Sequence, residues 1–207
     1  MLFFMSTTLL LSFLTFALVS SITPGPNNVM LMASGANFGF RPTLPHLAGV
    51  SVGFAAMVIL VGLGLAGIFA AAPWLYEILR WVGAAYLMFF AYKIATAKGL
   101  GSSETAGRPV TFWQAVAVQW VNPKAWSMIL SVITIFAPPD PTFWHIGLLT
   151  LLLFVVGLPC SVIWMTFGVG LKSFLSRPIA LRTFNVTMAI LLLVSLYPML
   201  DGFAANS

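Results

Sequence analysis

The first 40 residues contain no charged side chain, and Arg41 is the first ionised residue of the sequence. A transmembrane helix needs only about 20 apolar residues. A straight helix over the whole run would be about 60 Å long, twice the ~30 Å hydrocarbon core of a bilayer. The run therefore predicts a span that is tilted or broken. We expect the break at Thr23-Pro24-Gly25-Pro26-Asn27-Asn28, because two prolines and a glycine cannot continue a regular helix.

The rest of the chain is equally apolar. Apolar residues make up 60% of the 207 positions and charged residues 6%, whereas about a quarter of a soluble domain is charged. This composition excludes an ordinary soluble enzyme and a disordered protein, and the scattered Lys and Arg residues form no basic stripe for nucleic acid. It predicts an all-α integral membrane protein with six transmembrane helices. The expected spans are at about residues 5–39, 43–71, 74–95, 111–136, 143–171 and 181–200.

The distribution of basic residues predicts the orientation in the membrane. Cytoplasmic loops carry an excess of Lys and Arg. Seven basic residues follow the first, third and fifth expected spans: Arg41, Lys93, Lys98, Arg108, Lys172, Arg177 and Arg182. The opposite side carries Glu77, Arg80, Asp140 and Asp201. Both termini are therefore predicted to lie outside the cytoplasm.

A weak internal repeat appears at an offset of 99 residues. The offset pairs Pro24 with Pro123, and Pro42-Thr43-x-x-His46 with Pro141-Thr142-x-x-His145. Chance is the alternative explanation in so apolar a chain. If the repeat is real, each copy holds three spans and the odd number inverts the second copy, so that spans one and four are the broken ones. Transporters use this construction and bind substrate where the breaks meet. The repeats cover residues 1–97 and 98–207 within one membrane domain.

The two breaks offer groups that suit an amino acid. A broken span frees a half-helix N-terminus, which binds carboxylates, and carbonyls, which accept from an ammonium group. An amino acid zwitterion carries both groups close together. The candidate substrate-binding residues are Pro24, Gly25, Pro26, Asn27, Asn28, Asn122, Pro123 and Lys124. No catalytic residue, cofactor or resident metal is expected.

Lys124 lies deep inside the fourth expected span, where an ionisable residue indicates function. We interpret it as the counter-charge of a substrate carboxylate; the alternative is a lysine that snorkels or pairs with released carbonyls. For the asparagines the alternative is capping of the broken ends. His46 and His145 are candidate proton carriers, although neither has a carboxylate within a span, and the alternative is an interfacial position.

Two other readings are weaker. Gly49-Val50-Ser51-Val52-Gly53 spells a hydrolase nucleophile elbow, but it lies in a helix-length apolar run with no acid nearby, so we expect no enzyme. Glycines at this spacing, and at Gly35-x-x-x-Gly39, let helices pack closely; on an exposed face they allow a homodimer.

Export of a metal or other inorganic ion is the alternative transport function, but Cys160 and two histidines at different depths make a poor ligand set.

Several motifs together resemble the LysE/RhtB family of amino-acid exporters. They are Thr23-Pro24-Gly25-Pro26-Asn27-Asn28, Gly39-Phe40-Arg41, Leu47-Ala48-Gly49-Val50-Ser51-Val52-Gly53, Trp81-Val82-Gly83-Ala84-Ala85-Tyr86-Leu87 and Asn122-Pro123-Lys124-Ala125. The resemblance covers nearly the whole chain. It implies a multi-pass secondary transporter of the bacterial inner membrane that exports amino acids, driven by the proton gradient.

The resemblance also narrows the expected substrate. Family members that export lysine or arginine are expected to carry acidic residues inside their spans, and residues 43–71 and 111–136 contain none. A small neutral amino acid or derivative is therefore expected. The sequence is most similar to the branch that exports cysteine and O-acetylserine; serine, threonine and homoserine are further candidates.

Overall fold

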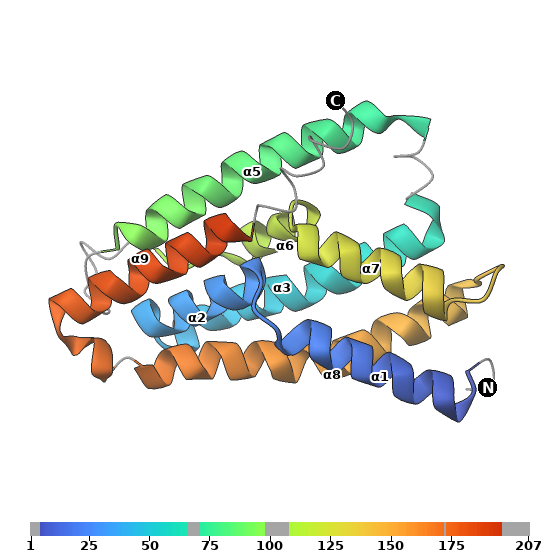
Figure 1. Ribbon diagram of the computed structural model, residues 1–207, viewed down its shortest axis with the longest axis horizontal. Helices are drawn as coiled ribbons and strands as arrows, with labels where there is room; N and C mark the ends of the chain where they lie inside the picture. Colours follow the sequence, from blue (N-terminus) through green and yellow to red (C-terminus); the bar gives the residue numbers. More distant parts are fainter. Residues whose placement is uncertain (1–4, 66–70, 98–107, 172, 196–207) are drawn as a thin grey trace.

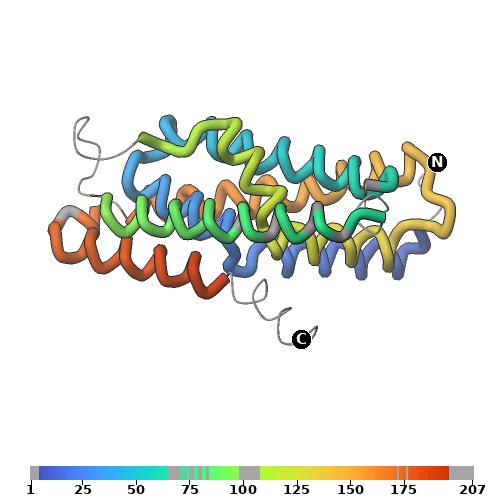
Figure 2. Tube along the Cα trace, turned by 90° about the horizontal axis from the view of Figure 1, so that it is seen from above, coloured from blue at the N-terminus to red at the C-terminus, as the bar shows by residue number. Residues whose placement is uncertain are grey.

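The computed structural model describes residues 5–65, 71–97, 108–171 and 173–195, and every regular element in these ranges is a helix. The α-helices are α1 (Thr7–Ile22), α2 (Pro26–Phe38), α3 (Phe40–Leu60), α5 (Pro73–Ala95), α6 (Phe112–Trp120), α7 (Pro123–Phe136), α8 (Phe143–Leu171) and α9 (Pro178–Val194). Two short helices, η1 (Val61–Leu65) and η2 (Phe174–Ser176), adjoin α3 and α9. The helices run side by side along the long axis of an elongated bundle (Figures 1 and 2).

Each expected span corresponds to a helix or a helix pair. The helices Phe40–Gly64 and Phe143–Leu171 are each long and apolar enough to cross a membrane, and α1 with α2 forms a third candidate as one bent span. Helix α3 begins at Phe40 and α9 at Pro178, earlier than the expected starts at residues 43 and 181. Residues 66–70 of the expected span 43–71 and residues 196–200 of the expected span 181–200 lie outside the described residues.

Both predicted breaks are present. Helix α1 ends at Ile22 and α2 begins at Pro26, with a bend of 50° between them. Pro26 and Pro123 each occupy the first turn of the second half-helix, where the missing N–H of proline leaves no helical hydrogen bond unmade. At the first break it is Pro26, and not Pro24, that occupies the helix position that Pro123 occupies at the second.

Close contacts between helices depend on glycines. A Cβ atom on Gly35 would collide with the carbonyl oxygen of Met165, and one on Gly168 with that of Met32, so these glycines bring α2 against α8. Gly49 and Gly53 in the same way bring α3 against α6. The Gly49-x-x-x-Gly53 face, which would allow a homodimer if it were exposed, therefore packs within the chain, as does Gly35.

Gly39, the second glycine of the Gly35-x-x-x-Gly39 pattern, has a different role. It connects α2 to α3 with φ +88°, a left-handed conformation that favours glycine, and a Cβ there would meet no atom. Gly39 is therefore a joint between two helices and not a packing residue.

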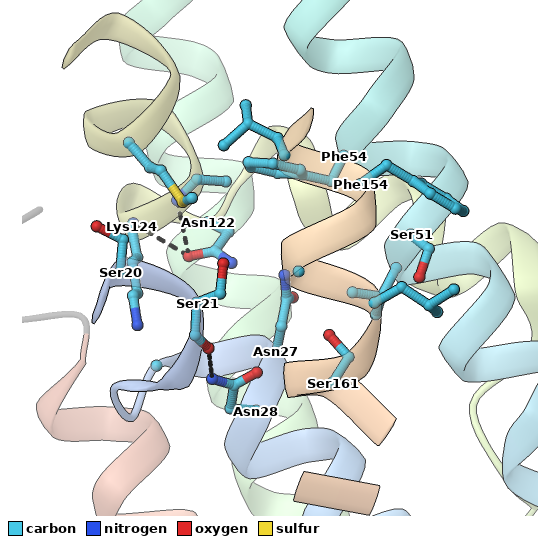
Figure 3. A pocket seen from close by; sticks show the side chains of 17 residues that line it. Ser20, Ser21, Asn27, Asn28, Ser51, Phe54, Asn122, Lys124, Phe154 and Ser161 are labelled. Atoms are coloured by element: carbon cyan, nitrogen blue, oxygen red, sulfur yellow. Dashed lines mark hydrogen bonds between the residues drawn. The ribbon is translucent and has the colours of Figure 1, made fainter. Parts of the chain in front are cut away.

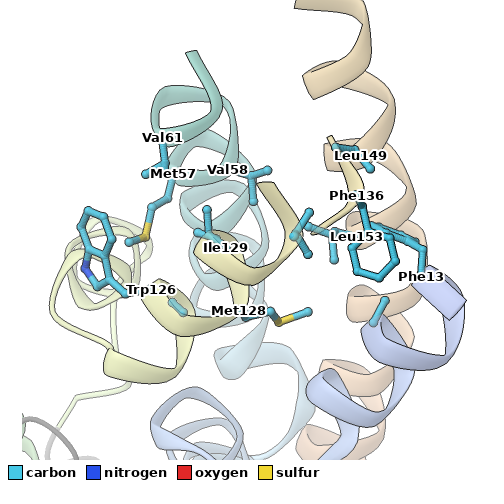
Figure 4. Packing of buried hydrophobic residues seen from close by; sticks show 13 residues of the cluster. Phe13, Met57, Val58, Val61, Trp126, Met128, Ile129, Phe136, Leu149 and Leu153 are labelled. Atoms are coloured by element: carbon cyan, nitrogen blue, oxygen red, sulfur yellow. The ribbon is translucent and has the colours of Figure 1, made fainter. Parts of the chain in front are cut away.

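The buried apolar residues form clusters at different heights of the bundle. One cluster joins α1, α3, η1, α7 and α8, with Ile129 and Phe136 of α7 packed against Phe13 and Leu149 (Figure 4). A second cluster joins α2, α5, α6 and α9. The two broken spans pass from one cluster to the other, so that the breaks lie between them.

The charged residues separate toward the ends of the bundle. The α2–α3 junction, the α8–α9 turn and the C-terminal end of α5 lie at one end (Figure 1) and carry Arg41, Arg177 and Lys93. The N-terminal end of α1 and the α7–α8 turn, which carries Asp140, lie at the other. Lys98, Lys172 and Asp201, which also entered the predicted orientation, lie outside the described residues.

The glycine contacts give a direct test of this packing. Gly168→Ala places a methyl group against the backbone of α2 and should destabilise the protein by about 1–3 kcal/mol. Gly170→Ala, two residues further along α8, has no atom within 4 Å of the new Cβ and should leave stability unchanged or slightly increased. Thermal unfolding of the purified protein in detergent measures both, and equal melting temperatures for the two variants would contradict the packing.

Candidate functional site

A cavity lies where the two broken spans meet (Figure 3). Its volume is about 80 Å³, enough for several waters. Among its lining residues, Met128 and Leu153 belong to the apolar cluster of Figure 4, and Val50 belongs to another cluster, with Leu31 and Met165. Its lining is Ser20, Ser21, Gly25, Asn27, Asn28, Val50, Ser51, Phe54, Asn122, Lys124, Ala125, Met128, Leu153, Phe154, Gly157, Leu158 and Ser161.

Lys124 connects the second break to the first. Its Nζ donates to the Thr23 carbonyl at 2.6 Å, to Thr23 Oγ1 at 2.8 Å and to the Pro24 carbonyl at 3.3 Å. This is the alternative foreseen from the sequence, a lysine paired with released carbonyls. No carboxylate pairs with Lys124 among the described residues, whose two acids, Glu77 and Asp140, are both exposed.

Two of the candidate asparagines cap broken helix ends. Asn122 Oδ1 accepts from the backbone N–H groups of Lys124 and Ala125 and so caps the N-terminus of α7. Asn28 Nδ2 donates to the carbonyls of Ser21 and Thr23 at the end of α1. Both asparagines therefore satisfy backbone groups that the breaks would leave unpaired.

Asn27 instead joins the two broken spans. Its side chain donates to Gln119 Oε1 at 2.8 Å and accepts from Gln119 Nε2 at 3.3 Å, across 92 positions of sequence. Gln119 is fully buried, and its amide also donates to the Ala115 carbonyl. This amide pair attaches the start of α2 to the end of α6.

The N-terminus of α2 is not capped by a side chain. Gly25 occupies the N-cap position and has no side chain to accept a hydrogen bond, while Pro26 has no N–H. The positive end of the helix macrodipole, with the N–H groups of Asn27 and Asn28, therefore remains available at the cavity. Together with the Lys124 ammonium it makes this wall of the cavity electropositive.

Sequence reasoning missed several residues of this region. Trp164 Nε1 donates to the Ile22 carbonyl at the end of α1, and Trp126 Nε1 donates to the Trp120 carbonyl at the end of α6. Four serines also line the cavity: Ser20, Ser21, Ser51 and Ser161. Ser51, the serine of the elbow-like motif, donates to the Leu47 carbonyl of its own helix. Single polar residues in apolar helices were the only signal that could have identified these serines.

The two histidines paired by the internal repeat occupy different environments. His46 lies inside α3, is 1% exposed, and its Nδ1 has no hydrogen-bond partner. His145 lies in the first turn of α8, where its Nδ1 contacts the backbone N–H and the hydroxyl of Thr142 at 3.1 Å. Neither lines the cavity.

A second cavity, of about 210 Å³, lies toward the basic end of the bundle. Its lining includes Lys93, Arg108, Ser34, Asn37 and Gln114. Gln114 belongs to a capping box with Thr111 at the start of α6, so it reaches neither the first cavity nor the breaks.

The alternative of metal transport requires several ligands that converge. Within the ranges that the structure describes, no group of three or more His, Cys, Asp or Glu residues could hold an ion. Cys160 is a buried free thiol there.

An apolar helical bundle with a polar cavity between two broken spans has the architecture of a membrane transport protein. The family model described as LysE type translocator matches residues 18–197, and the chain belongs to this family. A cysteine/O-acetylserine efflux protein of Escherichia coli (strain K12) is 35% identical over 193 residues, 91% of this chain and 95% of the relative. One of Salmonella paratyphi A is 34% identical over 167 residues, 79% and 84% of the two chains. No solved structure matches the chain.

Proposed function

We propose that this protein exports small neutral amino acids or their derivatives from the cytoplasm across a bacterial inner membrane. Cysteine, O-acetylserine, serine, threonine and homoserine are the candidate substrates. The observation that carries the proposal is the position of Lys124, a cation with no carboxylate partner among the described residues, beside the uncapped N-terminus of α2. A half-buried positive site of this kind favours an anionic group, and the carboxylate of an amino acid supplies it.

The lining of the cavity supports a neutral side chain. It contains hydroxyl, amide and apolar groups but no Asp or Glu that could bind a second ammonium group. Phe54, Met128 and Phe154 are among the apolar lining residues that could contact the substrate side chain. The names of the Escherichia coli and Salmonella relatives, cysteine/O-acetylserine efflux proteins, agree with a small and neutral substrate.

The helix contacts support two inverted repeats of three spans each. The broken span α1–α2 packs on α8, and the broken span α6–α7 packs on α3 and η1, so each lies against the second span of the other repeat. Helices α5 and α9, the third spans, pack on each other. We therefore expect alternating access by rocking of residues 1–97 against residues 98–207 around the breaks.

The orientation of the bundle in the membrane is inferred from the charged residues at its two ends. Arg41, Lys93 and Arg177 lie at the end that we assign to the cytoplasm. The second cavity, with Lys93 and Arg108, is then on the cytoplasmic side, and both chain termini are outside the cytoplasm. Substrate would enter past this cavity and leave between α1, α7 and α8.

Counterflow in proteoliposomes tests the function. Liposomes preloaded with unlabelled neutral amino acids should take up labelled cysteine, O-acetylserine, serine, threonine or homoserine, but not lysine. Lys124→Ala should reduce the exchange about 100-fold, because the substrate carboxylate loses its cationic partner. Arg182→Ala, at an exposed cation of α9, is the matched control and should exchange normally.

Two results would contradict the proposal in different ways. Full exchange by Lys124→Ala would remove the lysine from the mechanism. No exchange of any amino acid by folded wild-type protein would mean that the transported solute is of another class.

Coupling to the proton gradient is the second part of the proposal, and His46 is its candidate. The elements packed against α3 are α2, α6, α8 and η1. Helices α2 and α6 and η1 contain no titratable residue, and α8 contributes only His145 and Cys160. His46, whose Nδ1 has no hydrogen-bond partner among the described residues, is therefore the candidate acceptor of the coupled proton in this region.

The two histidines serve as each other's control. His46→Asn should retain counterflow, which needs no net proton movement, but lose uphill export driven by a pH gradient. His145→Asn should retain both activities, because that ring contacts Thr142 at the start of α8 and does not line the cavity. Gradient-driven export by His46→Asn at the wild-type rate would exclude His46 as the coupling residue.

A further inference from the structure

We infer that the carbonyl groups of Thr23 and Pro24 form the ammonium subsite of the carrier, and that Lys124 occupies this subsite when no substrate is bound. The inference rests on the proposed function and deepens it. In the absence of substrate, the Lys124 ammonium group then takes the place of the substrate ammonium group, and its hydrogen bonds act as a latch that connects the two broken spans.

The geometry at Thr23 is that of an ammonium site. A primary ammonium group has three N–H donors, and three oxygens surround Lys124 Nζ at 2.6, 2.8 and 3.3 Å. All three oxygens are neutral, so the site binds a cation without neutralising it. The ammonium group of an amino acid has the same donors and the same charge.

The position of Gly25 supports this assignment independently. A Cβ atom on Gly25 would lie 2.5 Å from Lys124 Cδ and 3.3 Å from Nζ. Gly25 is extended, with φ −170°, so its backbone does not require glycine. The missing side chain therefore provides the space through which the lysine reaches Thr23, and it places Nζ beside a residue of the cavity wall.

The exchange of ammonium groups would follow from charge balance. The substrate carboxylate enters at the uncapped N-terminus of α2 and attracts the Lys124 ammonium, which then leaves Thr23 and Pro24. The Thr23 carbonyl would keep the Asn28 amide as a donor, but Thr23 Oγ1 and the Pro24 carbonyl would be left without a donor. At the depth of the breaks in a membrane this is unfavourable unless the ammonium group of the substrate takes the place of Lys124 as donor. Release of the latch frees the two broken spans to move relative to each other.

This mechanism defines the substrate class. A hydroxy acid has the carboxylate but leaves the oxygens unpaired, whereas an amine such as ethanolamine has the ammonium but cannot draw Lys124 away. Only a zwitterion with both groups completes the exchange. The carrier should therefore bind serine and reject both lactate and ethanolamine.

Binding to the purified protein in detergent tests the inference, with serine and ethanolamine as probes. Wild-type protein should bind serine and should bind ethanolamine at least tenfold more weakly. Lys124→Ala, which vacates the subsite, should bind ethanolamine at least tenfold better than wild type and serine at least tenfold worse. Gly25→Ala, which pushes the lysine from the oxygens but retains its charge, should also gain ethanolamine binding. Gly147→Ala, where a Cβ meets no atom, is the control and should behave as wild type.

The outcomes separate the inference from the proposed function. If neither Lys124→Ala nor Gly25→Ala binds ethanolamine better than wild type, the inference is overturned, even if wild type exchanges amino acids. A gain in both variants, without serine binding by wild type, would support the ammonium subsite and contradict amino-acid export. Gain in Gly25→Ala alone, with Lys124→Ala unfolded, would still support the subsite.

Discussion

The structure depends on satisfying the backbone groups of two broken helices inside hydrocarbon. Each unpaired group there is unfavourable by several kcal/mol, so a broken span persists only where other residues bind its free ends. Asn28 and Trp164 bind the carbonyls at the end of α1, and Trp126 binds one at the end of α6. Because Trp164 belongs to α8, this requirement also fixes α1 against its neighbour. The cavity exists where these constraints converge.

The two breaks are not equivalent, and the difference gives the site its chemistry. The side-chain oxygen of Asn122 caps the N-terminus of α7, whereas Gly25 leaves the N-terminus of α2 without a side-chain cap. Lys124 extends from the capped break to the backbone oxygens of the uncapped one. One wall of the cavity therefore combines an uncapped half-helix N-terminus with a cation that is held only by neutral oxygens. Both groups favour an anionic ligand group.

The sequence predicted the features that depend on local chemistry. Proline and glycine located both breaks, and asparagine beside each break indicated capping, which Asn28 and Asn122 perform. It did not predict the Asn27–Gln119 pair or the use of Gly49 and Gly53 within the chain, because helix packing decides them. It also did not predict the different surroundings of the two histidines: the same Pro-Thr-x-x-His pattern lies inside α3 at His46 and spans the start of α8 at His145.

The central claim is that substrate binds between the two breaks, and protection of a cysteine at this position tests it most directly. Cys160 is the only cysteine in the sequence, so Ser21→Cys in a Cys160→Ser background carries one thiol at the cavity. Serine or O-acetylserine should slow alkylation of that thiol at least tenfold, lysine should not, and Ser173→Cys, beyond α8, should react at one rate throughout. Unchanged alkylation of Ser21→Cys under saturating substrate that the same protein exchanges would contradict the account.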